Sequence, residues 1–172
     1  MTDADLGRLT RSGELWRLTF TRRLAHPQEK VWRAVTDPDE MTSWFPDRMV
    51  GDRRAGAKLR FVTSGDDGFD GELLVFDPPA VMELMWGVDR LRIELAPDGD
   101  GTLLTLTDTF GELGKAARDG AGWHECLDRL AGTLDGQPPV ERGRRFAEVH
   151  PRYAEALGPD ATTIGVPEGY AK

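Results

Sequence analysis

The architecture of this chain follows from one segment in its last third, Gly122-Trp-His-Glu-Cys-Leu-Asp-Arg-Leu-Ala-Gly-Thr-Leu-Asp-Gly136. The charged residues lie off its apolar positions, and Gly136 with the prolines that follow is typical of a helix end. The apolar positions recur at helical spacing and form one stripe, which consists of Trp123, Leu127, Leu130, Ala131 and Leu134. A helix with a single apolar stripe needs a partner surface, and the residues before it predict strands.

Six strands are expected upstream of this helix, because β-forming residues alternate in short runs between turn signals. The predicted strands span residues 14–25, 58–63, 71–76, 81–86, 91–95 and 102–110. No helix-length segment separates the last five, which excludes a doubly wound parallel sheet and favours an antiparallel meander. The period of two places Asp108 in phase with the leucines at 104 and 106, and Glu72 in phase with Phe76.

Two short helices are predicted between the first two strands, at residues 27–36 and 37–45. Asp37 is expected to be the N-cap of the second, with Pro38 at the first helical position. A further helix is expected over residues 141–157, kinked at Pro151. The chain therefore divides into a flexible N-terminus (1–13), one domain (14–137) and a C-terminal extension (138–172).

Composition restricts the partners. The formal net charge of −8 argues against nucleic acid or an anionic membrane surface as the main partner, because both would repel the chain. A single cysteine, Cys126, excludes an internal disulfide framework and fits a reducing compartment. The sequence contains no long apolar run and no signal-peptide pattern, so a cytoplasmic protein without a membrane span is expected.

Motifs for catalysis and cofactor binding are absent from the sequence. There is no phosphate-binding loop and no glycine-rich dinucleotide fingerprint. His26, His124, His150 and Cys126 do not have metal-ligand spacing, and Cys126 and His124 lie two residues apart, which points them to different sides of a helix. The sequence therefore predicts no catalytic residue, no metal site and no cofactor, and it favours binding over catalysis.

Several segments carry a resemblance to a known family. They are PQEKVWRAVT (27–36), DPDEMTSWF (37–45), GELLVFDPP (71–79), MELMW (82–86), GTLLTLT (101–107) and GWHECLDRL (122–130). On these residues, over about 14–137, the chain resembles the SRPBCC (START-like, helix-grip) superfamily. Within it, the chain is similar to the C-terminal domain of Aha-type activators of the heat-shock ATPase. The resemblance implies an α+β helix-grip fold, in which a six-stranded curved antiparallel sheet wraps around a long C-terminal helix and encloses a cavity.

A ligand site between the sheet and the helix is expected from this arrangement. Its predicted residues are Trp44, Phe45, Phe61, Phe76, Trp86, Leu106, Asp108, Trp123, His124 and Leu127. Asp108 and His124 are the polar anchors in this set, and burial would raise the pKa of an inward carboxyl. Two alternatives remain open: the large side chains fill the space themselves, or Asp108 lies at a strand end and reaches water.

The preferred function is non-covalent binding of a small, mostly apolar organic molecule in that cavity. One alternative is a protein-interaction module of the co-chaperone type, with a chaperone as partner and a role in the stress response, as the resemblance implies. Another is a polyketide cyclase or dehydratase, which needs a titrating group such as Asp108 in the cavity. The chain is expected to be a monomer or a homodimer.

Overall fold

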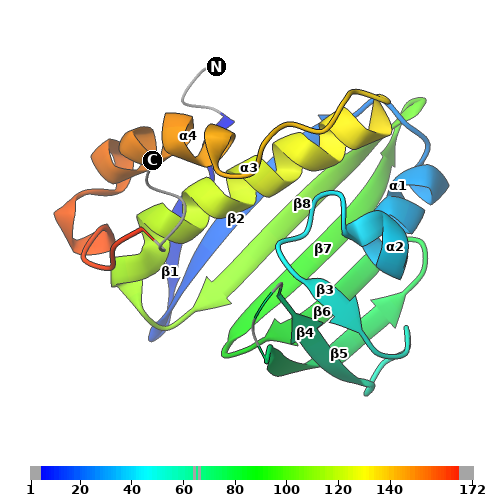
Figure 1. Cartoon of the computed structure of the whole chain (residues 1–172), viewed down its shortest axis with the longest axis horizontal. Helices are drawn as coiled ribbons and strands as arrows, with labels where there is room; N and C mark the ends of the chain where they lie inside the picture. The colour runs from blue at the N-terminus through cyan, green and yellow to red at the C-terminus, as the bar shows by residue number, and fades with distance from the viewer. Residues whose placement is uncertain (1–4, 64, 66, 167–172) are drawn as a thin grey trace.

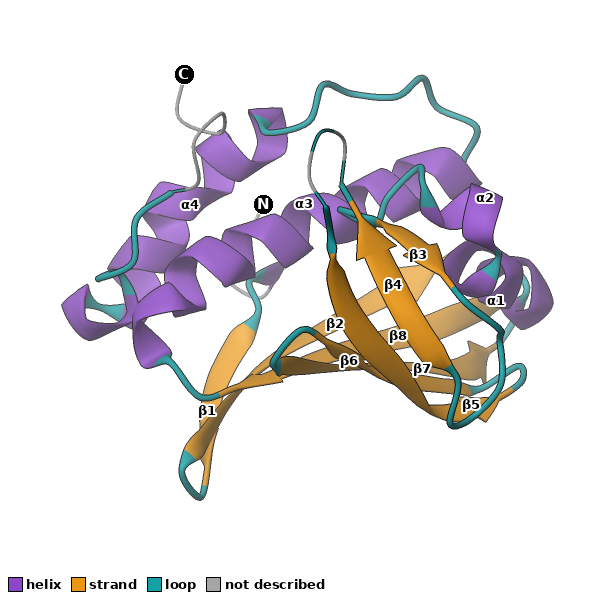
Figure 2. Ribbon diagram, turned by 60° about the horizontal axis from the view of Figure 1, so that its bottom comes forward, coloured by secondary structure: helices purple, strands orange, loops and turns teal. Residues whose placement is uncertain are grey.

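The computed structural model describes residues 5–63, 65 and 67–166, so the outer parts of the predicted N-terminal and C-terminal segments lie outside the described residues. Its centre is one antiparallel sheet with the strand order β1-β2-β8-β7-β6-β5-β4-β3. The sheet is strongly curved, and the helices lie on its concave side (Figures 1 and 2). No described helix is long and apolar enough to cross a membrane.

The sheet has eight strands, so the prediction of six was wrong. The strands are β1 (Arg8–Ser12), β2 (Leu15–Leu24), β3 (Arg48–Val50), β4 (Lys58–Val62), β5 (Phe69–Asp77), β6 (Val81–Trp86), β7 (Asp89–Asp98) and β8 (Gly101–Phe110). The two additional strands, β1 and β3, lie at the edges of the sheet. An edge strand forms through backbone pairing with one neighbour and needs little apolar alternation, which explains why the sequence pattern did not reveal them.

Alternation along the central strands separates a buried face from a polar one. In β8, Leu104, Leu106, Asp108 and Phe110 are buried, whereas Thr105, Thr107 and Thr109 are partly exposed on the opposite face. The buried carboxyl of Asp108 therefore lies on the core side, as its phase predicts. The same alternation in β7 buries Leu91, Ile93 and Leu95.

A β-bulge in β5 changes which residues point inward. The register with β6 shifts between Leu73 and Val75, and Leu73 is fully buried opposite Leu84. The predicted inward phase of Glu72 was therefore wrong, because the extra residue of a bulge reverses the alternation on one side of it. The Glu72 carboxylate instead pairs with Lys58 at 3.2 Å, where both side chains are exposed.

Helices α1 (Gln28–Thr36) and α2 (Pro38–Met41) follow β2. The Asp37 side chain accepts hydrogen bonds from the backbone N–H groups of Asp39 and Glu40, which caps α2. After α2, the indole N–H of Trp44 donates to the carbonyl of Ala34 at 2.9 Å, and this bond ties the two helices together. Lys30 in α1 donates to the carbonyl of Leu134, so this helical pair sits at the C-terminal end of the long helix.

The long helix α3 (Ala116–Leu134) begins six residues before Gly122, where the prediction placed its start. A short 3-10 turn (Leu113–Lys115) leads into it. Its first two turns contain Ala116, Ala117, Gly120 and Ala121, all buried. Small residues carry a weak periodic signal, so a link was expected here, yet they are what permits close packing against neighbouring elements.

Helix α4 (Arg144–Leu157) lies along the outer side of α3, as Figures 1 and 2 show. Its buried residues Phe146, Val149 and Tyr153 are spaced at three and four positions, as the sequence predicts for a helix in this region. Pro151 lies inside the helix, and a second 3-10 turn (Pro159–Ala161) follows its end. The extension therefore packs on the same domain through the Tyr153 face.

Contact between Gly120 and Tyr153 gives a stability test. A Cβ on Gly120 would lie 2.8 Å from the Tyr153 ring, whereas a Cβ on Gly122 of the same helix meets nothing within 4 Å. We expect Gly120→Ala to lower the free energy of unfolding by roughly 1–3 kcal/mol through overpacking. Gly122→Ala, the matched control, should raise it by about 0.5–1 kcal/mol through helix propensity. Urea denaturation measures both, and equal stabilisation by the two variants would contradict this packing.

Candidate functional site

Aromatic side chains fill the middle of the space between sheet and helix. Trp44 and Phe61 are completely buried, and Phe45 is nearly so. The Phe45 ring lies 6.1 Å from that of Phe61, 6.4 Å from Trp86 and 5.6 Å from Trp123, measured between centroids. The middle of the space between the sheet and α3 is therefore a packed aromatic core.

A cleft of about 710 Å³ opens beside this core, on the side where α3 begins. We call it the aromatic cleft; it is lined by Pro46, Phe69, Trp86, Asp89, Lys115, Arg118, Asp119, Gly122, Trp123, Glu125, Cys126, Arg142 and Phe146. Its wall is a run of edge-to-face rings, with Phe69 5.6 Å from Trp86 and Trp86 5.3 Å from Trp123. The lining residues come from β5, β6, β7, the 3-10 turn before α3, α3, α4 and two loops, so the cleft exists only in the folded chain.

Asp47 fixes the orientation of Trp86 in this wall. One carboxylate oxygen of Asp47 accepts from the Trp86 indole N–H at 2.8 Å, and the other accepts from the Thr63 hydroxyl at 2.7 Å. Asp47 is itself buried, which strengthens both bonds because water does not compete for them. The indole face is thereby presented to the cleft in one orientation.

The floor of the aromatic cleft is charged. Lys115 donates through Nζ to Oδ2 of Asp89 and lies 3.6 Å from Oδ2 of Asp119. Arg118 pairs with Asp119 at 2.9 Å. Burial raises the pKa of Asp89, and the hydrogen bond and charge of Lys115 oppose this rise. The pair of Lys115 and Asp89 is nearly inaccessible to solvent, so both side chains are held in place by each other.

Asp108 lies beneath the wall of the cleft. Its Oδ2 accepts from the indole N–H of Trp123 at 3.1 Å, whereas its Oδ1 has no hydrogen-bond partner among the described residues. Burial raises the pKa of Asp108 to about 8, and the charges of Asp89 and Asp119 contribute in the same direction. At neutral pH the group is therefore mainly a neutral carboxylic acid.

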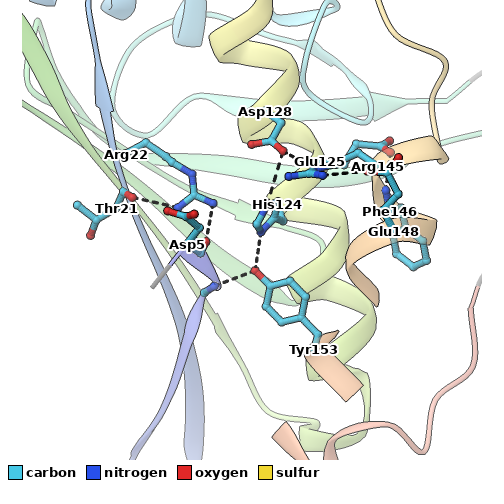
Figure 3. Close-up of polar contacts among 11 residues, drawn as sticks. Asp5, Thr21, Arg22, His124, Glu125, Asp128, Arg145, Phe146, Glu148 and Tyr153 are labelled. Atoms are coloured by element: carbon cyan, nitrogen blue, oxygen red, sulfur yellow. Dashed lines mark hydrogen bonds and ion pairs between the residues drawn. The ribbon is translucent and has the colours of Figure 1, made fainter. Parts of the chain in front are cut away.

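His124 belongs to a different network, at the contact between α3 and α4 (Figure 3). Its Nδ1 lies 3.0 Å from the hydroxyl of Tyr153, which also accepts from the backbone N–H of Gly7 at 2.8 Å. Since Nε2 faces the Asp128 carboxylate at 3.6 Å, we assign the histidine proton to Nε2, and the Tyr153 hydroxyl then donates to Nδ1. Burial lowers the pKa of His124 to about 4, so the ring is neutral.

The structure places the ten predicted site residues in four surroundings. Trp86 and Trp123 line the aromatic cleft, and Asp108 lies directly under Trp123. Five others are part of the buried core, namely Trp44, Phe45, Phe61, Leu106 and Leu127. Phe76 packs on Trp32 of α1 at 5.4 Å, away from the cleft, and His124 faces Tyr153.

Several residues of the cleft were not predicted from the sequence. They are Pro46, Phe69, Asp89, Lys115, Arg118, Asp119, Gly122, Glu125, Cys126, Arg142 and Phe146. Phe69 points inward only because of the bulge in β5, and Arg142 and Phe146 come from the extension. Cys126 had been rejected as a nucleophile, and burial raises the pKa of its thiol to about 12, which keeps it protonated.

A larger hollow of about 800 Å³ lies between α3 and the segment that joins it to α4. It is lined mainly by polar and charged residues such as Asp128, Arg129 and Arg145, together with Pro138 and Pro139. No aromatic side chain lines it within the described part of the chain. The aromatic cleft is therefore the better candidate for an organic ligand, because such sites are mostly apolar with a few placed polar groups.

Comparison with known families identifies the class of protein. Residues 25–135 match the model of the family described as Activator of Hsp90 ATPase homolog 1-like protein. The match covers more than half of the chain, from the end of β2 to the end of α3. The chain belongs to this family, which confirms the resemblance to the SRPBCC superfamily. Comparison with curated protein sequences gives no match.

Solved structures share the fold. CalU16 from Micromonospora echinospora is 28% identical with a TM-score of 0.69, and the match covers 88% of this chain and 94% of that one. DynU16, a protein in the dynemicin biosynthetic locus, is 28% identical with a TM-score of 0.65, covering 73% of this chain and 49% of that one. The conserved protein EF2215 from Enterococcus faecalis, at 18% identity and a TM-score of 0.74, covers 88% of this chain and 90% of that one and supports the fold alone.

The raised pKa of Asp108 predicts that the stability of the protein depends on pH. The folded carboxyl keeps its proton up to about pH 8, whereas the unfolded one loses it above its ordinary pKa of 3.8. The unfolded state therefore binds fewer protons in this window, and stability falls as pH rises. Asp108→Asn has no such proton to lose, so its stability relative to wild type should grow by on the order of 1 kcal/mol per pH unit from pH 5 to pH 8.

Urea denaturation at pH 5, 6.5 and 8 measures this trend. Glu72→Gln is the matched control, because it neutralises a carboxylate that is exposed and paired with Lys58. That change should stay within about 0.5 kcal/mol at every pH. A difference between Asp108→Asn and wild type that does not change with pH would show that the Asp108 carboxyl is ionised in the fold.

Proposed function

We propose that this protein binds a small, mostly apolar organic molecule with a planar ring in the aromatic cleft. The observation that carries the proposal is the run of Phe69, Trp86 and Trp123 along a cleft whose floor is charged. Aromatic rings contact one another by offset stacking or edge to face, so a wall of this kind favours a flat aromatic ligand. The cleft volume of about 710 Å³ suits a molecule of drug size.

Arg142 gives the ligand a polar requirement. Its guanidinium lies at the cleft and donates through Nη2 to the carbonyls of Thr42 at 3.2 Å and Phe45 at 3.0 Å. These two bonds use one nitrogen, and no carboxylate pairs with Arg142 among the described residues. The remaining N–H groups favour a ligand that carries a carbonyl, phenol or acidic oxygen at this edge.

The relatives support a small-molecule role. DynU16, 28% identical, is described as a protein in a biosynthetic locus. The family name refers instead to activation of a heat-shock ATPase, which would require a protein partner. The recessed aromatic wall favours the small molecule, since a protein partner would use exposed surface more than a cleft.

Binding fits the position of Asp108 better than catalysis does. A raised pKa is what a general acid needs near neutral pH. However, the carboxyl is completely buried, its Oδ2 is held by Trp123, and it does not line the aromatic cleft. A ligand in the cleft would contact Trp123 rather than the acid, so we assign Asp108 a role in holding the indole.

Binding of 8-anilinonaphthalene-1-sulfonate, a flat aromatic anion, tests the proposal. The purified protein should enhance the fluorescence of this probe saturably with one site. Trp86→Leu should weaken binding about tenfold, because loss of an aromatic wall residue costs about 1.5 kcal/mol. Titration calorimetry gives the stoichiometry, and circular dichroism shows that the variant stays folded.

Trp32→Leu is the matched control. Trp32 is half-buried like Trp86 and packs on Phe76, but it lies away from the cleft. Its replacement should leave the dissociation constant for the probe unchanged. Equal loss in both variants, or binding of several probe molecules, would mean that the probe does not occupy the aromatic cleft.

A further inference from the structure

Three aspartates from different elements converge next to the aromatic cleft, two of them, Asp89 and Asp119, in its lining and the third, Asp108, behind it. Asp89 begins β7, Asp108 lies in β8, and Asp119 lies in the first turn of α3. Each contributes an oxygen atom, and these three atoms all lie within 4.8 Å of one another. We call these residues the acidic cluster. Asp89 and Asp108 are buried, and the side chain of Asp119 is only 11% exposed.

Two oxygen atoms of the acidic cluster have no hydrogen-bond partner in the described part of the chain. They are Oδ1 of Asp89 and Oδ1 of Asp108, both buried. Buried carboxylate oxygens are almost always paired, because an unpaired one loses its water without compensation. Two of them in one cluster therefore mark a position that attracts a cation or a proton.

The charges around the acidic cluster also favour a bound cation. Lys115 and Arg118 are the basic groups that face the three carboxylates, which leaves one negative charge when all three are ionised. Lys115 contacts the Oδ2 atoms of Asp89 and Asp119 and leaves both Oδ1 atoms of the buried pair free. Among the described residues, the only donor to Asp108 is the neutral indole of Trp123. The cluster is thus under-neutralised on the side of Asp108.

We infer that Asp89, Asp108 and Asp119 form a binding site for a divalent cation of the calcium class. Calcium prefers oxygen ligands at about 2.3–2.6 Å, so carboxylate oxygens on opposite sides of the ion lie about 4.6–5.2 Å apart. Three oxygens within 4.8 Å of one another can therefore contact one such ion. Magnesium dehydrates reluctantly and usually keeps several waters, so a buried set of three carboxylates suits it less.

Lys115 is the competitor of the ion, because its ammonium already contacts Asp89 and Asp119. The Lys115 side chain is long and lines the aromatic cleft, so it can turn into the cleft when an ion takes its place. The groups that face Asp108 are Asp89 from β7, Asp119 and Trp123 from α3, and Lys115 from the preceding turn.

Terbium luminescence tests the site in the full-length protein at pH 7. Tb³⁺ is a probe for calcium sites, and Trp123, whose indole nitrogen lies 3.1 Å from Asp108, is positioned to sensitise its emission. The wild type should show saturable emission that Ca²⁺ displaces, and calorimetry should give one Ca²⁺ per chain. Asp108→Asn should weaken binding at least tenfold. Asp98→Asn, at an exposed ion pair with Arg23, is the control and should leave binding unchanged.

Lys115→Met separates an ion site from an ordinary salt-bridge cluster. Removal of the competing ammonium should tighten Ca²⁺ binding at least tenfold, an effect that a merely structural role for the aspartates would not produce. Circular dichroism shows whether each variant is folded. The inference is overturned if Ca²⁺ does not displace Tb³⁺ from the wild type, or if binding survives Asp108→Asn. It is also overturned if folded Lys115→Met binds Ca²⁺ no more tightly. Binding of the aromatic probe is measured separately, so its failure leaves this test intact.

Discussion

The packing of Trp123 against the concave face of the sheet connects the parts of this structure. Its ring fits against Phe45 and Trp86, and its N–H is bonded to Asp108 in β8. The same residue therefore anchors α3 in the core, forms a wall of the aromatic cleft and satisfies one oxygen of a buried acid. An aromatic side chain with one polar atom can do this because its apolar body and its N–H point to different surroundings.

Burial in apolar surroundings determines the protonation of Asp108 and His124. Burial raises the pKa of Asp108 and lowers that of His124, so both groups are mainly neutral at pH 7 although they lie close to charged residues. The two sites differ in how their polar atoms are satisfied. His124 and Tyr153 form a hydrogen bond with each other, whereas Asp89 and Asp108 each have one oxygen without a partner among the described residues. This difference explains why the first network serves α3–α4 docking and the second suggests a ligand.

The fold limits where a ligand can bind but does not identify the ligand. Proteins of the same architecture use sites built on it for different purposes, so the family match does not by itself define a substrate. In this chain the aromatic core closes the centre of the grip and moves the open space to one side. The C-terminal extension then contributes Arg142 and Phe146 to that space. The lining of the cleft is therefore formed partly by a segment outside the matched region.

The sequence by itself determined the central architecture: helical spacing placed Trp123, Leu127 and Leu130 on one stripe, and strand alternation placed Asp108 on the core side. Both are periodic signals that local chemistry imposes. The sequence did not reveal the edge strands β1 and β3, the small-residue start of α3 or the bulge in β5, because none of these leaves a periodic signal. Only the tertiary structure decided the cleft and the acidic cluster, since Asp89, Asp108 and Asp119 meet through strand pairing and helix docking.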